Sequence, residues 1–247
     1  GARGLSIVNV VGSTIARESD DVLYTWAGPE IAVATTKAFS TQLAVVYLIG
    51  LYCAEALGTL DEAEYDRIVS ELLLIPTKLE QILDNRADIQ YFASLYFNHP
   101  SIFFIGRNID YAIGMEGSLK LKEISYIHSE AYAAGELKHG PIALVDEGEP
   151  VVFIVPPQRG RNVLHAKVIS GIEEVKARGA YIIAVAEQGD PDVERYADVV
   201  FWRPACPTLM SPLVDVVPLQ LFAMDMAKLK GYDVDKPRNL AKSVTVE

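Results

Sequence analysis

Along the chain, short apolar runs alternate with longer stretches that have the length of helices. The apolar runs are rich in Val, Ile and Phe, which is typical of strands, and they show little two-residue alternation. Such strands fit a sheet covered on both faces, and their alternation with helices indicates parallel pairing through crossover connections. We therefore predict an α/β fold with a doubly wound parallel sheet. The expected strands of its main part are Ile102–Ile105, Ser129–Tyr132, Pro150–Val155, Ala180–Val185 and Asp198–Trp202, and the expected helices are Tyr111–Ser125, Asn162–Arg178 and Leu213–Lys230.

The first residues repeat the order of strands and helix that is found in the last part of the chain. The three matching elements are expected strands at Leu5–Val10 and Asp21–Thr25 and an apolar helix at Lys37–Ala56. Val8 and Val185, which occupy matching strands, are 177 residues apart. A repeat at this scale indicates duplicated modules, and the roughly 80 residues that separate Ile102 from Ile182 have no counterpart before Leu5. The first module is therefore expected to lack its front half.

The repeat predicts four segments. Residues 1–58 form the C-terminal half of the first module, and residues 59–99 form a helical linker in which Asp61 is suited to cap a helix. Residues 100–232 form a complete second module, and residues 233–247 form a C-terminal tail.

Charge and cysteine content narrow the possible partners. The formal net charge is −11 and no basic block is present, which argues against nucleic acid and against an anionic membrane surface. Two cysteines imply no disulfide framework, as expected in the cytoplasm, and neither they nor the four scattered histidines have metal-ligand spacing. We expect no metal and no organic cofactor. The apolar run Leu43–Cys53 is too short for a bilayer and is expected to be a buried helix.

One expected helix carries a charged stripe with candidate chemistry. Glu116, Lys120 and Glu123 follow one another at spacings of four and three, which places them on one helix face. Such a stripe is usually a solvated face. Here the strand Ile102–Ile105 and the pair Lys138–His139 flank the helix, and this dense setting favours acid/base chemistry.

Three motifs carry a resemblance to a known family. They are Glu116–Tyr126, Ala133–Pro141 and Asp235–Glu247. They resemble the isomerase part of the glutamine–fructose-6-phosphate aminotransferases, the glucosamine-6-phosphate synthases. The resemblance runs from about Leu5 to the last residue and is weaker at residues 61–98 and 158–197. It implies that both modules are of the sugar-isomerase type.

The resemblance also implies residue roles. Glu123 matches the proton-transferring glutamate of the family, and Lys120 matches the lysine that supports it. His139 matches the histidine that opens the sugar ring and is lent by a neighbouring subunit. Lys242 matches the lysine that meets the sugar carbonyl, so the tail is expected to close over the active site.

Further residues are implied as substrate contacts. The backbone of Val33 matches a position that contacts the sugar, with Thr35 beside it, and Ala241 belongs to the same set in the tail. The implied reaction converts fructose 6-phosphate and ammonia to glucosamine 6-phosphate in a homodimer. The family's ammonia-releasing glutaminase domain is absent from this sequence, as is its phosphate-binding turn.

Two alternatives remain open. The chain could be a non-catalytic module that binds a sugar phosphate, or a related sugar-phosphate deaminase or deglycase. The other histidines are assigned no chemistry: His99 is expected in a loop, His128 in the core or beside the site, and His165 on the surface of a polar helix.

Overall fold

The computed structural model describes residues 1–160 and 163–241, and the chain divides into two compact units, Gly1–Leu73 and Leu74–Glu247. The first unit contains β1 (Leu5–Val8), α1 (Thr14–Glu18), β2 (Asp21–Tyr24) and α2 (Lys37–Ala56). The strands β1 and β2 pair in parallel, as predicted. The Ser13 hydroxyl accepts a hydrogen bond from the Ala16 amide at the start of α1, which is the role of a helix N-cap.

Helix α2 has the expected bounds but not the expected burial. Of its twenty residues only Ala38, Val45 and Leu51 are buried, so the prediction that Leu43–Cys53 is a buried helix is wrong. By length and composition alone, α2 and the segment Thr208–Leu229 could each cross a membrane. This is weak evidence, because core helices pass the same test and 83% of the second segment's apolar window is buried.

Helix α3 (Glu62–Asp84) runs from the first unit into the second. It begins after Asp61, whose carboxylate accepts a hydrogen bond of 2.8 Å from the Glu64 amide, as expected for a cap. Pro76 lies inside the helix, which continues for two further turns.

The second unit is built on a five-stranded sheet in the order β4-β3-β5-β6-β7, and every neighbouring pair is parallel. The prediction of a doubly wound parallel sheet is confirmed, because the chain leaves β3 toward one edge and then crosses to the other. The strands are β3 (Ser101–Gly106), β4 (His128–Ala133), β5 (Pro150–Ile154), β6 (Tyr181–Glu187) and β7 (Val199–Arg203). The helices are α4 (Ala87–Tyr96), α5 (Ile109–Ser125), α6 (Val163–Lys176), α7 (Pro191–Tyr196) and α8 (Ser211–Leu229), with short 3₁₀ turns at Leu137–His139, Pro141–Leu144 and Thr208–Met210.

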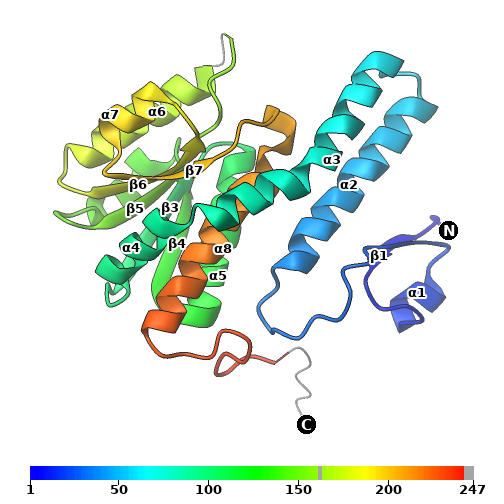
Figure 1. The fold of residues 1–247 in the computed structure, drawn as a ribbon, viewed down its shortest axis with the longest axis horizontal. Coiled ribbons are helices and arrows are strands. Elements are labelled where there is room, and N and C mark those ends of the chain that lie inside the picture. Colours follow the sequence, from blue (N-terminus) through cyan, green and yellow to red (C-terminus); the bar gives the residue numbers. More distant parts are fainter. Residues whose placement is uncertain (161–162, 242–247) are drawn as a thin grey trace. The chain divides into compact units, whose positions relative to one another are not determined.

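Helices cover both faces of this sheet (Figure 1). On one face α6 and α7 pack over buried side chains of β3, β5 and β6. On the other face α5 packs on β3 and β4, α4 packs on β7, and α8 lies against both helices. The apolar strands are therefore buried from both sides, which is why they lack alternation.

A glycine brings α5 close to its neighbours. A Cβ atom on Gly117 would lie 2.7 Å from Leu219 Cδ1 on α8 and 3.1 Å from the Phe104 ring on β3. No larger residue fits without movement of these side chains, so Gly117 sets the position of α5. The same helix carries the charged stripe.

Candidate functional site

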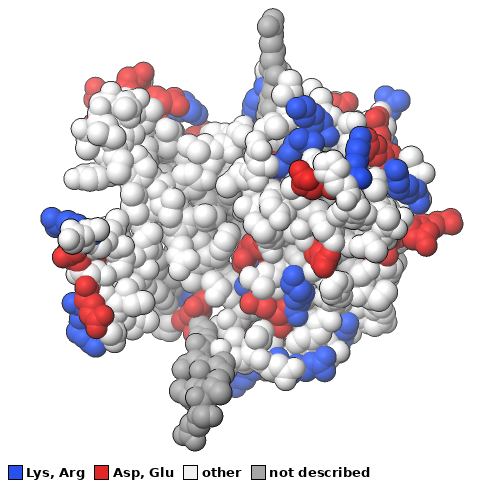
Figure 2. Space-filling view, turned by 180° about the vertical axis from the view of Figure 1, so that it is seen from behind, with Lys and Arg blue, Asp and Glu red and all other residues white. Residues whose placement is uncertain are grey.

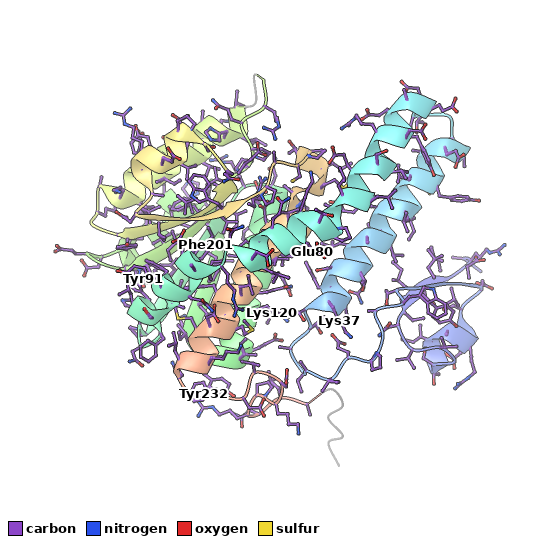
Figure 3. The ribbon with its side chains drawn as sticks, viewed as in Figure 1. Lys37, Glu80, Tyr91, Lys120, Phe201 and Tyr232 are labelled. Atoms are coloured by element: carbon purple, nitrogen blue, oxygen red, sulfur yellow. The ribbon has the colours of Figure 1, made fainter. Side chains whose placement is uncertain are left out.

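Lys120 lies on the inner face of α5 and is almost fully buried. Its side chain is 3% exposed, and its ammonium lies 2.5 Å from Glu123 Oε2 and 3.5 Å from Glu116 Oε1. The side chains of Glu116 and Glu123 are 12% and 22% exposed. One buried cation therefore sits between two carboxylates, one on the preceding turn and one on the following turn of the helix. Figure 3 labels Lys120. The solvated-face interpretation of the stripe does not hold.

The electrostatics of this group follow from its burial. Burial raises the pKa of Glu116, and the Lys120 ammonium opposes that rise. A buried ammonium is costly unless it is paired, and the carboxylates of Glu116 and Glu123 supply this pairing for Lys120. Glu123 is the more exposed of the two carboxylates, which makes it the one that a ligand reaches more easily.

A second set of contacts fixes α5 against the edge strand β4. The Ser129 hydroxyl donates a hydrogen bond of 2.8 Å to the Ser118 carbonyl, and the Lys122 ammonium donates one of 3.0 Å to the Ser129 carbonyl. Because these bonds tie helix to sheet on the far side of the stripe, Lys120 and Glu123 are presented by a rigid element.

The other predicted site residues belong to other segments of the chain. His139 ends a 3₁₀ turn, its side chain is 72% exposed, and its Nδ1 lies 2.9 Å from Glu136 Oε2 instead of joining the Lys120–Glu123 pair. Val33 and Thr35 are half-buried residues of the first unit, in the segment before α2. Ala241 is exposed, and Lys242 lies outside the described residues.

The prediction for His165 is wrong, and the structure excludes the core position that was one of two expectations for His128. His165 is 2% exposed, and its Nε2 lies 2.7 Å from the Asp190 carboxylate. The reason is periodicity, since His165 continues the buried stripe of Val168, Ile169 and Ile172 on α6. His128 is 67% exposed, because it is the first residue of the edge strand β4 and points away from the sheet core.

Among the described residues, one group has the composition of a metal site, namely His165, Asp190 and Asp192. Both oxygens of the Asp190 carboxylate are already used. Oδ1 accepts the amides of Asp192 and Val193 at the start of α7, and Oδ2 pairs with His165. Asp190 is therefore the N-cap of helix α7, and its pairing with His165 fixes the carboxylate in that position.

The sequence analysis missed a buried ionic cluster at the carboxyl edge of the sheet. The Arg203 side chain, which is fully buried at the end of β7, pairs with Asp215 of α8 and lies 3.3 Å from Glu187 of β6. Burial raises the pKa of Asp110 in the first turn of α5 to about 7, the charge of Asp215 adds to the rise, and Arg203 opposes it. The cluster lies at the C-terminal ends of the strands, where open α/β sheets usually bind ligands.

A cleft of about 450 Å³ lies between the α3–α4 turn and β7, where Asp84, Asp88 and Trp202 are among its lining residues. Of the predicted site residues that the structure describes, none lines this cleft. The acid/base constellation on α5 is the stronger candidate, because it combines burial, opposite charges and contact geometry.

Comparisons with known proteins agree with the fold. A family model described as SIS domain matches residues 1–52 and 95–230. The C-terminal domain of glucosamine-fructose-6-phosphate aminotransferase from Francisella tularensis is similar at 38% identity, with a TM-score of 0.87 over 95% of this chain and 66% of that chain. A glucosamine-6-phosphate deaminase from Thermotoga maritima shares the fold, with a TM-score of 0.69 at 24% identity over 98% of this chain and 66% of that chain.

Curated relatives match the whole chain. A glutamine–fructose-6-phosphate aminotransferase (isomerizing) from Caldanaerobacter subterraneus subsp. tengcongensis is 55% identical over 247 residues, and one from Corynebacterium efficiens is 52% identical. Each alignment covers 100% of this chain and 40% of the relative. The chain therefore spans less than half the length of the curated relatives that it matches.

Proposed function

The chain belongs to the SIS-domain family, and from that premise we propose that it is the isomerase part of a glucosamine-6-phosphate synthase. In this proposal it converts fructose 6-phosphate and ammonia to glucosamine 6-phosphate, and a glutaminase domain in the same protein releases the ammonia from glutamine. The observation that carries the proposal is the buried Lys120 ammonium between the carboxylates of Glu116 and Glu123, in a chain whose relatives bear this activity in their names.

The reaction needs ring opening, imine formation at C2 and proton transfer between C1 and C2. A carboxylate is suited to the proton transfer, and Glu123 has this role in the proposal. The ammonium of Lys120, 2.5 Å away, holds the Glu123 carboxylate in one position. Positive charge beside the reacting carbons also stabilises the oxygen on which negative charge develops.

His139 opens the sugar ring in the proposal, because histidine titrates near neutral pH. Its 72% exposure favours use by a second copy of the chain, as in a homodimer with shared sites. Lys242 meets the open-chain carbonyl, while Val33, Thr35 and Ala241 contact the sugar. The proposed setting is the cytoplasm.

The distribution of charged side chains favours binding of a small ligand over binding of a large polyanion. On the face that Figure 2 presents, Lys and Arg side chains lie in small mixed groups with Asp and Glu. With a formal net charge of −11, this pattern disfavours a polyanionic partner and leaves room for a sugar phosphate bound by a few local donors.

The test is product formation by the natural full-length protein, supplied with fructose 6-phosphate and glutamine or ammonia. We expect glucosamine 6-phosphate, identified by mass and by NMR. Consumption of glucosamine 6-phosphate without its net formation under excess ammonia would indicate a deaminase. Saturable sugar-phosphate binding without turnover would indicate a binding module.

A further inference from the structure

The segment between β2 and α2 is built around the side chain of Asn9, the residue that follows β1. Its Oδ1 accepts hydrogen bonds of 3.0 Å from the Thr25 hydroxyl and from the Ala27 amide, and its Nδ2 donates one of 2.8 Å to the Gly28 carbonyl. A backbone amide only donates and a carbonyl only accepts, so these partners fix the orientation of the Asn9 amide group. We call Asn9 with its three hydrogen bonds the Asn9 clamp.

The Asn9 clamp encloses a residue in a costly backbone conformation. Trp26 has φ 52°, in the left-handed region, where a residue with a Cβ atom is strained. Trp26 is 77% exposed, so burial of its indole contributes little to holding this conformation. The hydrogen bonds from Asn9 reach the residues on either side of Trp26. They therefore hold the chain in a path that it would otherwise leave.

A second contact closes the segment that follows the clamp. The Lys37 ammonium donates a hydrogen bond of 2.6 Å to the Pro29 carbonyl. Lys37 is the first residue of α2 and is labelled in Figure 3. A positive charge is unfavourable at this end of a helix, and the Pro29 carbonyl gives it an acceptor. Residues 30–36 thus form a short loop whose two ends are tied together, which restricts the conformations open to it.

This loop carries two of the residues proposed to contact the sugar. Val33 and Thr35 are half-buried, and Ala34 between them is 5% exposed. Residues 25–36 contain no helix or strand, so no regular ladder of backbone hydrogen bonds fixes them. A backbone that contacts a ligand has to be held in one geometry by its supporting contacts. In this segment the Asn9 clamp supplies that support.

We propose that Asn9 is a positioning residue, which holds residues 25–28 on the end of β1 and so presents Val33 and Thr35 to the sugar phosphate. This inference rests on the proposed function. Without the clamp the loop samples several conformations, and the apparent affinity for the sugar falls by the fraction that no longer fits it. The proton transfer proposed for Glu123 proceeds unchanged once the sugar is bound.

Two substitutions of Asn9 test this role in the natural full-length protein. Asn9→Ala removes all three hydrogen bonds. Asn9→Asp keeps an oxygen in place of Oδ1 but loses the donor to the Gly28 carbonyl, so its effects should be smaller. The matched control is Asn85→Ala, at an exposed asparagine whose Nδ2 donates a hydrogen bond of 2.8 Å to the Gln81 carbonyl.

The first readout is hydrogen exchange, followed by mass spectrometry of peptides that contain Ala27. We expect exchange to become roughly fivefold faster in Asn9→Ala, because the Ala27 amide loses its acceptor. Peptides from α8 should exchange at the wild-type rate, which shows that the change is local. This readout requires no enzymatic activity.

The second readout is the affinity for fructose 6-phosphate, measured by calorimetry without ammonia. We expect Kd to rise roughly tenfold in Asn9→Ala, since the bound conformation of the loop is populated less often. At saturating fructose 6-phosphate, kcat should stay within about threefold of wild type, as for loss of binding that is equal in the ground state and the transition state. Asn85→Ala should match wild type in both readouts.

Unchanged exchange at Ala27 in Asn9→Ala would overturn the clamp, whether or not the protein has synthase activity. Faster exchange with unchanged affinity would overturn the positioning role, as would an equal acceleration in the α8 peptides. If Asn9→Ala does not fold, the same measurements on Asn9→Asp decide.

The proposed function fails in a different way. A wild-type protein that binds fructose 6-phosphate without forming glucosamine 6-phosphate would refute the synthase function, while the affinities would still decide whether Asn9 positions the loop for the sugar. A wild-type protein that does not bind fructose 6-phosphate would refute the positioning role together with the proposed function, and the exchange rates alone would decide whether the clamp exists.

Discussion

The ammonium of Lys120 lies 2.5 Å from Glu123 Oε2, and the lysine side chain is only 3% exposed. Glu116 completes the arrangement from the preceding turn, 3.5 Å away. Removal of this buried cation would leave two neighbouring carboxylates without a counter-charge. The pair therefore links the stability of α5 to the chemistry proposed for it.

Replacing the central cation tests this link. We expect Lys120→Met to lower the free energy of unfolding by about 3–5 kcal/mol, because it leaves two carboxylates without their buried counter-charge. The double variant Lys120→Met, Glu116→Gln should recover part of the loss. Urea unfolding followed by circular dichroism measures both. A loss below about 1 kcal/mol would show that the pair is solvated.

The close approach of α5 to its neighbours gives a second prediction. Gly117→Ala places a methyl group 2.7 Å from Leu219 Cδ1, so we expect a loss of about 1–3 kcal/mol in unfolding free energy. The control is Gly171→Ala on α6, where the added atom lies 3.7 Å from the Phe153 ring and helix propensity favours alanine by up to about 1 kcal/mol. Equal effects of the two changes on the urea midpoint would contradict the role of Gly117.

The strands and long helices were predictable because their patterns are local. The bounds of α2 were predicted to the residue, and β3 was predicted to within one residue at each end. The stripe of Glu116, Lys120 and Glu123 was also visible, since helical spacing alone places the three residues on one face. Its burial was not, because burial depends on the packing of α5 against other elements.

Some errors were avoidable and others were not. The burial of His165 could have been found, because Val168, Ile169 and Ile172 extend its face of α6 at helical spacing. The contact of Arg203 with Asp215 could not, because it depends on which strand and helix ends meet at one edge of the sheet.

The buried ionic cluster predicts a pH dependence. Burial raises the pKa of Asp110 to about 7, so the folded protein holds a proton that the unfolded chain releases near pH 4. The contribution of Asp110 to the free energy of unfolding is fully present below about pH 4 and is lost as the pH rises through about 7. This pH-dependent contribution amounts to about 4 kcal/mol at most. Asp110→Asn should remove most of the pH dependence, because asparagine does not titrate.

The measurement is the urea midpoint of wild type and Asp110→Asn at pH 5 and pH 8. We expect the variant to gain stability relative to wild type as the pH rises across this interval. Parallel pH profiles for the two proteins would mean that Asp110 is already ionised in the folded state at pH 5.

The proposed sharing of active sites between two subunits gives a prediction for mixed subunits. Hybrids of His139→Ala and Glu123→Gln subunits should recover up to about half of the wild-type activity, because one of the two sites in each hybrid dimer is then intact. Differently tagged subunits, purified together after refolding and assayed for glucosamine 6-phosphate, provide the test. Hybrids of verified composition that show no recovery would mean that His139 and Glu123 act within one chain.

The central claim is that the Glu123 carboxylate moves the proton between C1 and C2 of the substrate. It is tested most directly by solvent deuterium incorporation at C1 of the sugar phosphate, measured by NMR in the natural full-length protein. We expect Glu123→Gln to slow incorporation by about 10²–10⁴-fold, as for loss of a general base, while sugar-phosphate binding persists. Glu130→Gln on β4 is the control and should exchange at the wild-type rate. Wild-type exchange by Glu123→Gln would contradict the account.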